Sequence, residues 1–223
     1  IAVAPAFIAV ALLIGYVREP ERAAQAGNAR PPLALADARR LPLRFWIVVL
    51  LGTVFTLARF SEAFLVLRAQ DTGLELSYVP AVMIVMNLLY AGAAYPAGAA
   101  ADRLRQRTLL LLGLAMLILA DLALAFARSP SMVFAGAALW GLHMALTQGL
   151  LSKLVADTAP AELLGTAFGV FNLVSGAALL LASVIAGSLW SVAGPSATFL
   201  AGAAFAAIAA VGLLTGMYFQ PKR

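Results

Sequence analysis

Two long apolar segments flanking a short basic one decide the fold. Residues 79–127 read VPAVMIVMNLLYAGAAYPAGAAADRLRQRTLLLLGLAMLILADLALAFA. The apolar parts, 79–101 and 108–127, each hold about 20 residues, which is the length an α-helix needs to cross the hydrocarbon core of a bilayer. The short basic connection between them predicts two antiparallel membrane-spanning helices.

Further apolar runs lie on both sides of this pair, at 1–17, 44–67, 131–152, 165–189 and 195–219. They are rich in Leu, Ala, Val and Gly, and they exceed the roughly 10 residues of a membrane β-strand. The first run is short and begins with Ile rather than Met, so we expect the chain to be a fragment of a longer protein. The predicted fold class is an all-α, polytopic helical membrane protein.

Composition excludes several other classes of protein. Of 223 residues, 63% are hydrophobic and 11% charged, whereas soluble domains are about 25% charged. This composition excludes a soluble enzyme, a disordered tail and a collagen-like fibre. The net charge of +5 does not predict nucleic-acid binding, because the charges lie between the apolar runs. With no Cys and one His, neither a metal site nor a cofactor is expected.

Residues 18–43 differ from the rest, being rich in charged residues and proline. We interpret them as a polar linker, within which 33–40 have the pattern of a short surface helix. If this linker is cytoplasmic and the loops alternate, 12 of the 15 Lys and Arg residues lie inside and 2 outside, with Arg59 in a span. Such a bias predicts a cytoplasmic linker and a cytoplasmic C-terminus.

The turn between the first two quoted helices carries a more specific pattern. One interpretation is an ordinary basic loop held at the anionic surface of the membrane. Its spacing also resembles the loop motif of the major facilitator superfamily, G-x-x-x-D-R-x-G-R-[RK]. Arg105 and Gln106 depart from that motif, as suits the weaker copy in the second half of these transporters. The matching residues are Gly98, Asp102, Arg103 and Arg107.

The resemblance extends over the whole chain, from helix six to helix twelve of that superfamily. It implies three parts: 1–17 as the truncated last helix of the N-terminal bundle, 18–43 as the cytoplasmic central linker, and 44–223 as the C-terminal six-helix bundle. Stretches 58–65 and 165–172 look like those of bacterial drug:proton antiporters, although Leu164 stands where those members have Arg.

This resemblance implies a function. The expected activity is secondary transport of a small molecule, coupled to H+, by alternating access, and not enzymatic catalysis. The expected setting is the bacterial plasma (inner) membrane, with the lipid bilayer and the missing N-terminal half of the same protein as partners.

Charged residues within a span are functional candidates, because placing them in lipid is costly. Arg59 and Glu62 lie in the run 44–67, and a continuous helix would put them on one face together with Gly52 and Thr56. One hypothesis is that this face lines the substrate path. The alternative is a self-neutralising pair that only packs helices.

Other polar residues give weaker predictions. Gly136, Trp140, His143 and Thr147 share a face of the run 131–152. His143 suits contact with a proton or substrate, or a structural hydrogen bond. The remaining candidates are Asp121, for proton coupling or for pairing with a neighbour, and Asn172, for the cavity or for helix packing beside several glycines.

Two alternatives to a transporter remain at this level. A non-transporting seven-helix receptor or scaffold is compatible with the number of spans. An intramembrane enzyme is disfavoured, because the chain lacks HExxH, GxxxxGK[ST] and a GxSG before His143. A retinal-binding protein is disfavoured because 195–219 contain no lysine.

Overall fold

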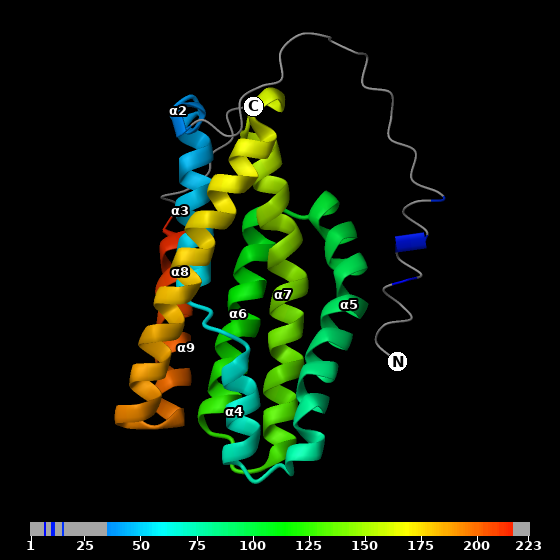
Figure 1. The fold of residues 1–223 in the computed structure, drawn as a ribbon, viewed down its shortest axis with the longest axis vertical. Helices are drawn as coiled ribbons and strands as arrows, with labels where there is room; N and C mark the ends of the chain where they lie inside the picture. Colours follow the sequence, from blue (N-terminus) through cyan, green and yellow to red (C-terminus); the bar gives the residue numbers. More distant parts are fainter. Residues whose placement is uncertain (1–6, 8–9, 12–14, 16–34, 216–223) are drawn as a thin grey trace. The chain divides into compact units, whose positions relative to one another are not determined.

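The computed structural model describes residues 7, 10–11, 15 and 35–215, and within these ranges the regular structure is helical throughout. The predicted all-α class is therefore confirmed (Figure 1). Most of the expected span 1–17 and most of the linker 18–43 fall outside the described residues. The elements are α2 (Leu35–Ala38), α3 (Leu43–Leu57), α4 (Ala63–Asp71), η1 (Leu76–Tyr78), α5 (Val79–Arg103), α6 (Gln106–Ala125), α7 (Pro130–Thr158), η2 (Ala161–Leu163), α8 (Leu164–Ala193) and α9 (Pro195–Leu214).

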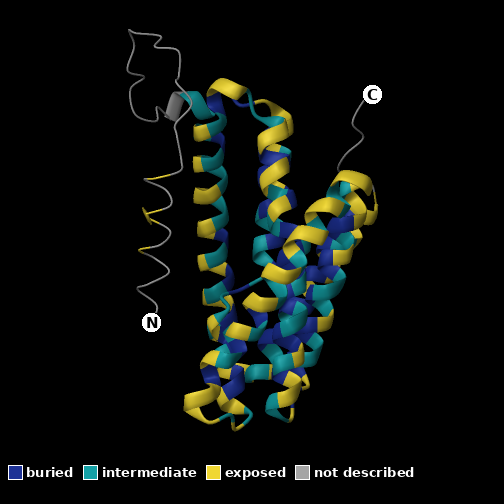
Figure 2. Cartoon of the chain, turned by 90° about the vertical axis from the view of Figure 1, so that its right-hand side faces the viewer, coloured by how far each residue is buried: buried dark blue, intermediate teal, exposed yellow. Residues whose placement is uncertain are grey.

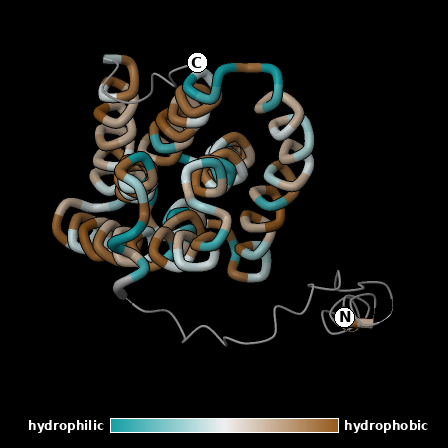
Figure 3. Tube along the Cα trace, turned by 90° about the horizontal axis from the view of Figure 1, so that it is seen from above, coloured by the Kyte–Doolittle hydropathy of each residue, from teal (hydrophilic) through white to brown (hydrophobic). Residues whose placement is uncertain are grey.

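Five helical segments of the described chain are long and apolar enough to cross a membrane. They are Leu76–Arg103, Gln106–Ala125, Pro130–Thr158, Ala161–Ala193 and Pro195–Leu214. Apolar residues also cover the outside of these helices, where a soluble protein would be polar (Figures 2 and 3). Leu173, Leu180 and Ile208, for example, are each about two-thirds or more exposed. A helix that is apolar all round fits a bilayer, and the chain is a multi-pass membrane protein.

The prediction of one continuous helix over 44–67 is wrong. Helix α3 ends at Leu57 and α4 begins at Ala63, and residues 58–62 are not helical. The backbone N–H of Ser61 donates instead to the hydroxyl of Ser183 on α8, at 3.2 Å. The hydroxyl of Ser61 accepts from the N–H of Ala63 at the start of α4, at 3.3 Å. We call residues 58–62 the helix break.

Helix α7 lies between α5 and α6, and α6 also packs against α9. Glycines permit the closest approaches between these helices. A Cβ added to Gly141 of α7 would collide with the backbone carbonyl of Met86 on α5. One added to Gly113 of α6 would collide with Thr147 on α7. Because neither backbone has room for a side chain there, α5, α6 and α7 form a tightly packed layer.

The two ends of the bundle differ in charge. We call the end with the α5–α6 turn, which carries Arg103, Arg105 and Arg107, the basic end. At the opposite end, the buried Arg68 of α4 donates to the carbonyls of Leu124, Ala125 and Ala127 at 2.9, 3.2 and 2.9 Å. These carbonyls lie at and just beyond the end of α6, where a helix has no internal donors left. Arg68 thus fastens α4 to α6.

Candidate functional site

The helix break holds two charged residues in the middle of an otherwise apolar segment. Arg59 and Glu62 are both half-buried, and no hydrogen bond or ion pair joins their side chains. The prediction that they share a helical face is wrong, because the helix stops between Leu57 and Ala63. Both charged groups instead project from non-helical backbone, a feature that membrane proteins tolerate only where the backbone is buried in protein or lines a cavity.

Polar groups from α5 and α7 lie near this break. Arg59 is close enough to interact electrostatically with the carboxylate of Glu62 and the phenol of Tyr90, and also with His143. The hydroxyl of Tyr90 on α5 donates to Oε1 of Gln148 on α7 at 3.5 Å. We call Arg59, Glu62, Tyr90 and Gln148 the polar centre. The sequence prediction missed Tyr90 and Gln148, although each interrupts an apolar run, a signal that could have marked them.

The predicted polar face of α7 packs against α6. Trp140, His143 and Thr147 are all buried, and Nδ1 of His143 lies 2.8 Å from the carbonyl oxygen of Gly113. The hydroxyl of Thr147 donates to the carbonyl of His143 in its own helix, at 2.8 Å. Gly136 gives room to Leu124 of α6. The four residues share a face as predicted, and in this structure that face is a helix interface.

Thr56, Gly52 and Asn172 lie on helices that flank the break. The hydroxyl of Thr56 donates to the carbonyl of Gly52, at 2.8 Å, and Gly52 faces the ring of Phe171 on α8. Asn172, next to Phe171, is exposed on the described part of the chain. The structure therefore places Gly52 at the α3–α8 interface, bonds Thr56 within its own helix, and leaves Asn172 on the surface of this bundle.

The motif residues of the basic end form two links between helices. Asp102 accepts a hydrogen bond from Nζ of Lys153 on α7, at 3.1 Å. Arg107 donates to the carbonyl of Leu214 at the end of α9. A Cβ on Gly98 would have no other atom within 4 Å, so the close helix approach lies at Gly141 instead. Arg103 is exposed.

Gly98 lines a groove between α5 and α7 with a volume of about 220 Å³. The groove runs from Tyr90 of the polar centre to Asp102 and Lys153 at the basic end, and its walls are mostly Ala, Gly and Leu. Lys153 was expected in a loop, but α7 continues to Thr158 and holds it opposite Asp102.

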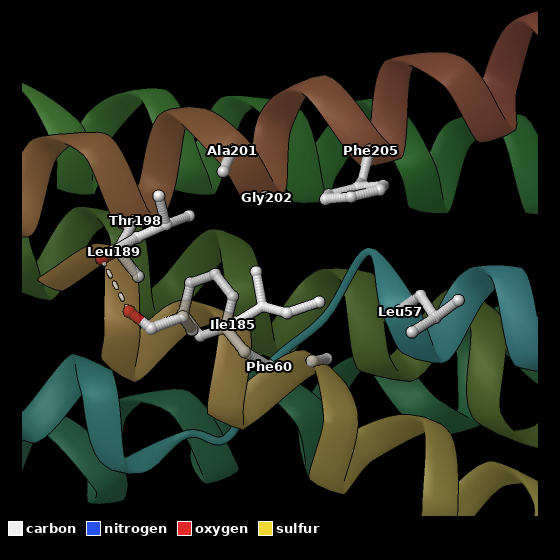
Figure 4. Close-up of a pocket in the computed structure, with 10 residues that line it drawn as sticks. Leu57, Phe60, Ile185, Leu189, Thr198, Ala201, Gly202 and Phe205 are labelled. Atoms are coloured by element: carbon white, nitrogen blue, oxygen red, sulfur yellow. Dashed lines mark hydrogen bonds between the residues drawn. The ribbon is translucent and has the colours of Figure 1, made fainter.

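Asp121 forms no hydrogen bond with the polar centre. It is fully buried in α6, and neither carboxylate oxygen has a hydrogen-bond partner. Beside it, the end of α3, the helix break, α8 and α9 line a partly open pocket of about 20 Å³ (Figure 4). Among the described residues, no group of three His, Cys, Asp or Glu side chains is placed to hold a metal ion.

Comparison with known proteins agrees with this architecture. The family model of the Major Facilitator Superfamily matches residues 60–223. The uncharacterized MFS-type transporter MJ1317 of Methanocaldococcus jannaschii is 32% identical over 182 residues, which are 79% of this chain and 46% of that protein. This chain thus spans about half the length of the curated relative it matches.

Solved structures show the same fold at lower identity. A POT family transporter in complex with 5-aminolevulinic acid matches with a TM-score of 0.64 and 17% identity, over 78% of this chain and 38% of that one. A POT family transporter in complex with a thioalcohol-conjugated peptide matches with a TM-score of 0.63 and 16% identity, over 77% and 37%. The family match covers most of the chain and the helical architecture agrees with it, so this chain belongs to the Major Facilitator Superfamily, whose members are transporters and not enzymes.

Proposed function

We propose that residues 44–223 form the C-terminal six-helix bundle of a proton-coupled exporter of small organic molecules. Residues 1–17 would be the last helix of an N-terminal bundle, and 18–43 the cytoplasmic linker between the bundles. The coverage of 46% of a related transporter supports this division. Alternating access in such proteins is a rocking of two bundles around a site near the membrane midplane. The N-terminal half and the lipid bilayer are therefore the necessary partners.

The observation that carries the proposal is the helix break with Arg59 and Glu62. Broken helices in membrane transporters place polar backbone and side chains where substrate and coupling ions bind. Here the break lies beside Tyr90, which reaches Gln148 on a third helix. A pair that served only to neutralise itself would be joined by an ion pair, and the two side chains are not joined. Both are left available to other ligands.

In the proposed cycle, Glu62 exchanges a proton for the substrate. A proton arriving from outside neutralises the carboxylate and weakens its hold on the substrate, which leaves outward. Release of that proton to the cytoplasm restores the carboxylate for the next substrate.

The basic end would act as the cytoplasmic gate. The Asp102–Lys153 bridge ties α5 to α7 at the mouth of the 220 Å³ groove, and its side chains are 75% and 42% exposed. An exposed ion pair contributes no more than about 1 kcal/mol, so the proposed latch opens easily. We place this end and the C-terminus in the cytoplasm of a bacterial cell, with the bundle in its plasma membrane, because positive residues gather on the inner side.

Substrate-dependent proton flux through the full-length protein in sealed vesicles tests the proposal. Glu62→Gln keeps the size of the side chain but cannot release a proton, so coupled flux should be lost while insertion is retained. Glu75→Gln, an exposed position bonded to Ser77, is the matched control and should keep full flux. If Glu62→Gln transports as well as the wild type, Glu62 does not couple protons. If the wild type moves no substrate, the scaffold alternative replaces the transporter.

A further inference from the structure

Asp121 is surrounded by apolar groups at the interface between α6 and α9. Its Oδ2 would lie 2.7 Å, and the ring of Phe60 2.9 Å, from a Cβ on Gly202 of α9. Because Gly202 has no side chain, the carboxyl group of Asp121 and the ring of Phe60 can both occupy the space beside it. An ionised carboxylate without a partner is very costly in such a place, whereas a neutral carboxylic acid is tolerated.

No charged group in the described residues offsets a charge on Asp121. Helix α9 brings no titratable side chain. Arg68 of α4 is engaged with carbonyl groups and Asp71, and His143 of α7 is directed to Gly113. Arg59 and Glu62 flank Phe60 in the break, and neither forms an ion pair with Asp121. The described residues therefore give Asp121 no partner for a negative charge.

Phe60 lies beside both Asp121 and the small pocket, because its ring and Oδ2 of Asp121 meet the same Cβ position on Gly202 and the ring also lines the pocket. The pocket has a volume of about 20 Å³ and is partly open to the outside, and its mostly apolar lining includes Phe60, Thr198 and Gly202 but not Asp121. Phe60 belongs to the helix break, so its backbone is not held in a helical ladder. Its ring is held by Phe64, Trp140 and Phe199, with centroids 5.2, 5.5 and 5.4 Å away.

We propose that Asp121 is a proton-binding site of this protein and that the ring of Phe60 controls access to it. When the ring moves aside, water that enters through the open side of the pocket reaches the carboxyl group and takes its proton as a hydronium ion. A hydronium ion restores the acid by the reverse step and leaves as water. This site requires neither transport nor Glu62, because it is formed by residues of the α6–α9 interface and by Phe60.

Infrared spectroscopy of the purified full-length protein at neutral pH tests the proton site. A protonated carboxyl has a carbonyl stretch that carboxylates lack. We expect one such band to disappear in Asp121→Asn, which is isosteric with the neutral acid, and to persist in Asp37→Asn, an exposed control paired with Arg40. Aspartate labelled with a heavy carbon isotope should shift the band in the wild type, which requires no substitution. A band that is unchanged by the labelled aspartate overturns the proton site.

Exchange in heavy water tests the role of Phe60. The carboxyl proton of Asp121, followed by the shift of its band, should exchange for deuterium slowly in the wild type and about tenfold faster in Phe60→Ala. This factor corresponds to a fall of about 1.4 kcal/mol in the free-energy barrier to opening. Phe60→Leu keeps an apolar side chain and should fold if Phe60→Ala does not, with an intermediate rate. Equal rates in the wild type and the folded variants overturn the control by Phe60. Glu62→Gln should leave the band in place, so a failure of the transport proposal is distinguishable from a failure of this one.

Discussion

At the scale of single residues, Arg68 is the side chain whose loss should be felt most at the end opposite the basic end. It is buried, and it donates to three carbonyls at the end of α6 as well as to Asp71. Arg68→Ala removes a charged donor from all three carbonyls, although those of Leu124 and Ala125 keep the N–H of Ala127 and the hydroxyl of Ser196. We expect a loss of about 1.5–3 kcal/mol, the range for hydrogen bonds to a charged group. Unfolding in mixed detergent micelles, followed by circular dichroism, measures it.

Arg128→Ala is the matched control, because Arg128 is exposed close to the same end of α6. It should leave the unfolding midpoint unchanged. Arg68→Lys keeps the charge but not the planar fork of donors, so its stability should fall between wild type and Arg68→Ala. Equal midpoints for Arg68→Ala and Arg128→Ala would show that Arg68 does not fasten α4 to α6.

At the scale of helices, the contact between α5 and α7 depends on Gly141. A methyl group there would collide with the backbone of Met86, and backbone cannot move aside as a flexible side chain can. Gly141→Ala should therefore separate the two helices and destabilise the bundle by about 1–3 kcal/mol. The fraction of protein that stays monodisperse after heating, measured by size-exclusion chromatography, reports this loss.

Gly149→Ala on the same helix is the control, because nothing lies within 4 Å of its Cβ position. Alanine favours a helix over glycine by up to about 1 kcal/mol, so this variant should be as stable as the wild type or more so. If Gly141→Ala is as stable as Gly149→Ala, the close packing of α5 against α7 at Gly141 does not stabilise the bundle. This packing would then not support the Tyr90–Gln148 contact, which joins the same two helices.

At the scale of the whole molecule, the difference in charge between the two ends of the bundle predicts its orientation in the membrane. The chain has no Cys, so single introduced cysteines report its topology without interference. Gln70 of α4 and Ala161 of η2 are both exposed, at opposite ends. We expect a membrane-impermeant thiol reagent to label Gln70→Cys in intact cells, and to label Ala161→Cys only after the membrane is opened. Labelling in the reverse pattern would invert the proposed orientation.

The sequence alone determined the class of protein and the positions of most spans. Hydropathy is a sum over neighbouring residues, so the predicted run 108–127 lies within two residues of α6 at both ends, and 165–189 falls inside α8. The motif at 98–107 identified the family for a similar reason, because its spacing is local. Polar residues in apolar runs, such as Arg59, Glu62 and Asp121, were found because any charge in a span stands out.

Only the tertiary structure decided how these residues meet. The helix break at 58–62 contains neither Gly nor Pro, and one of its backbone donors is satisfied by Ser183, far away in the sequence. Lys153 faces Asp102 because α7 extends past its apolar run, and the polar face of α7 turned to α6 because Gly113 leaves room for Thr147. The burial of Asp121 likewise depends on Gly202 and Phe60. Hydropathy shows which polar side chains are costly to place in lipid. Only the packing of helices that are distant in the sequence determines which groups those side chains contact.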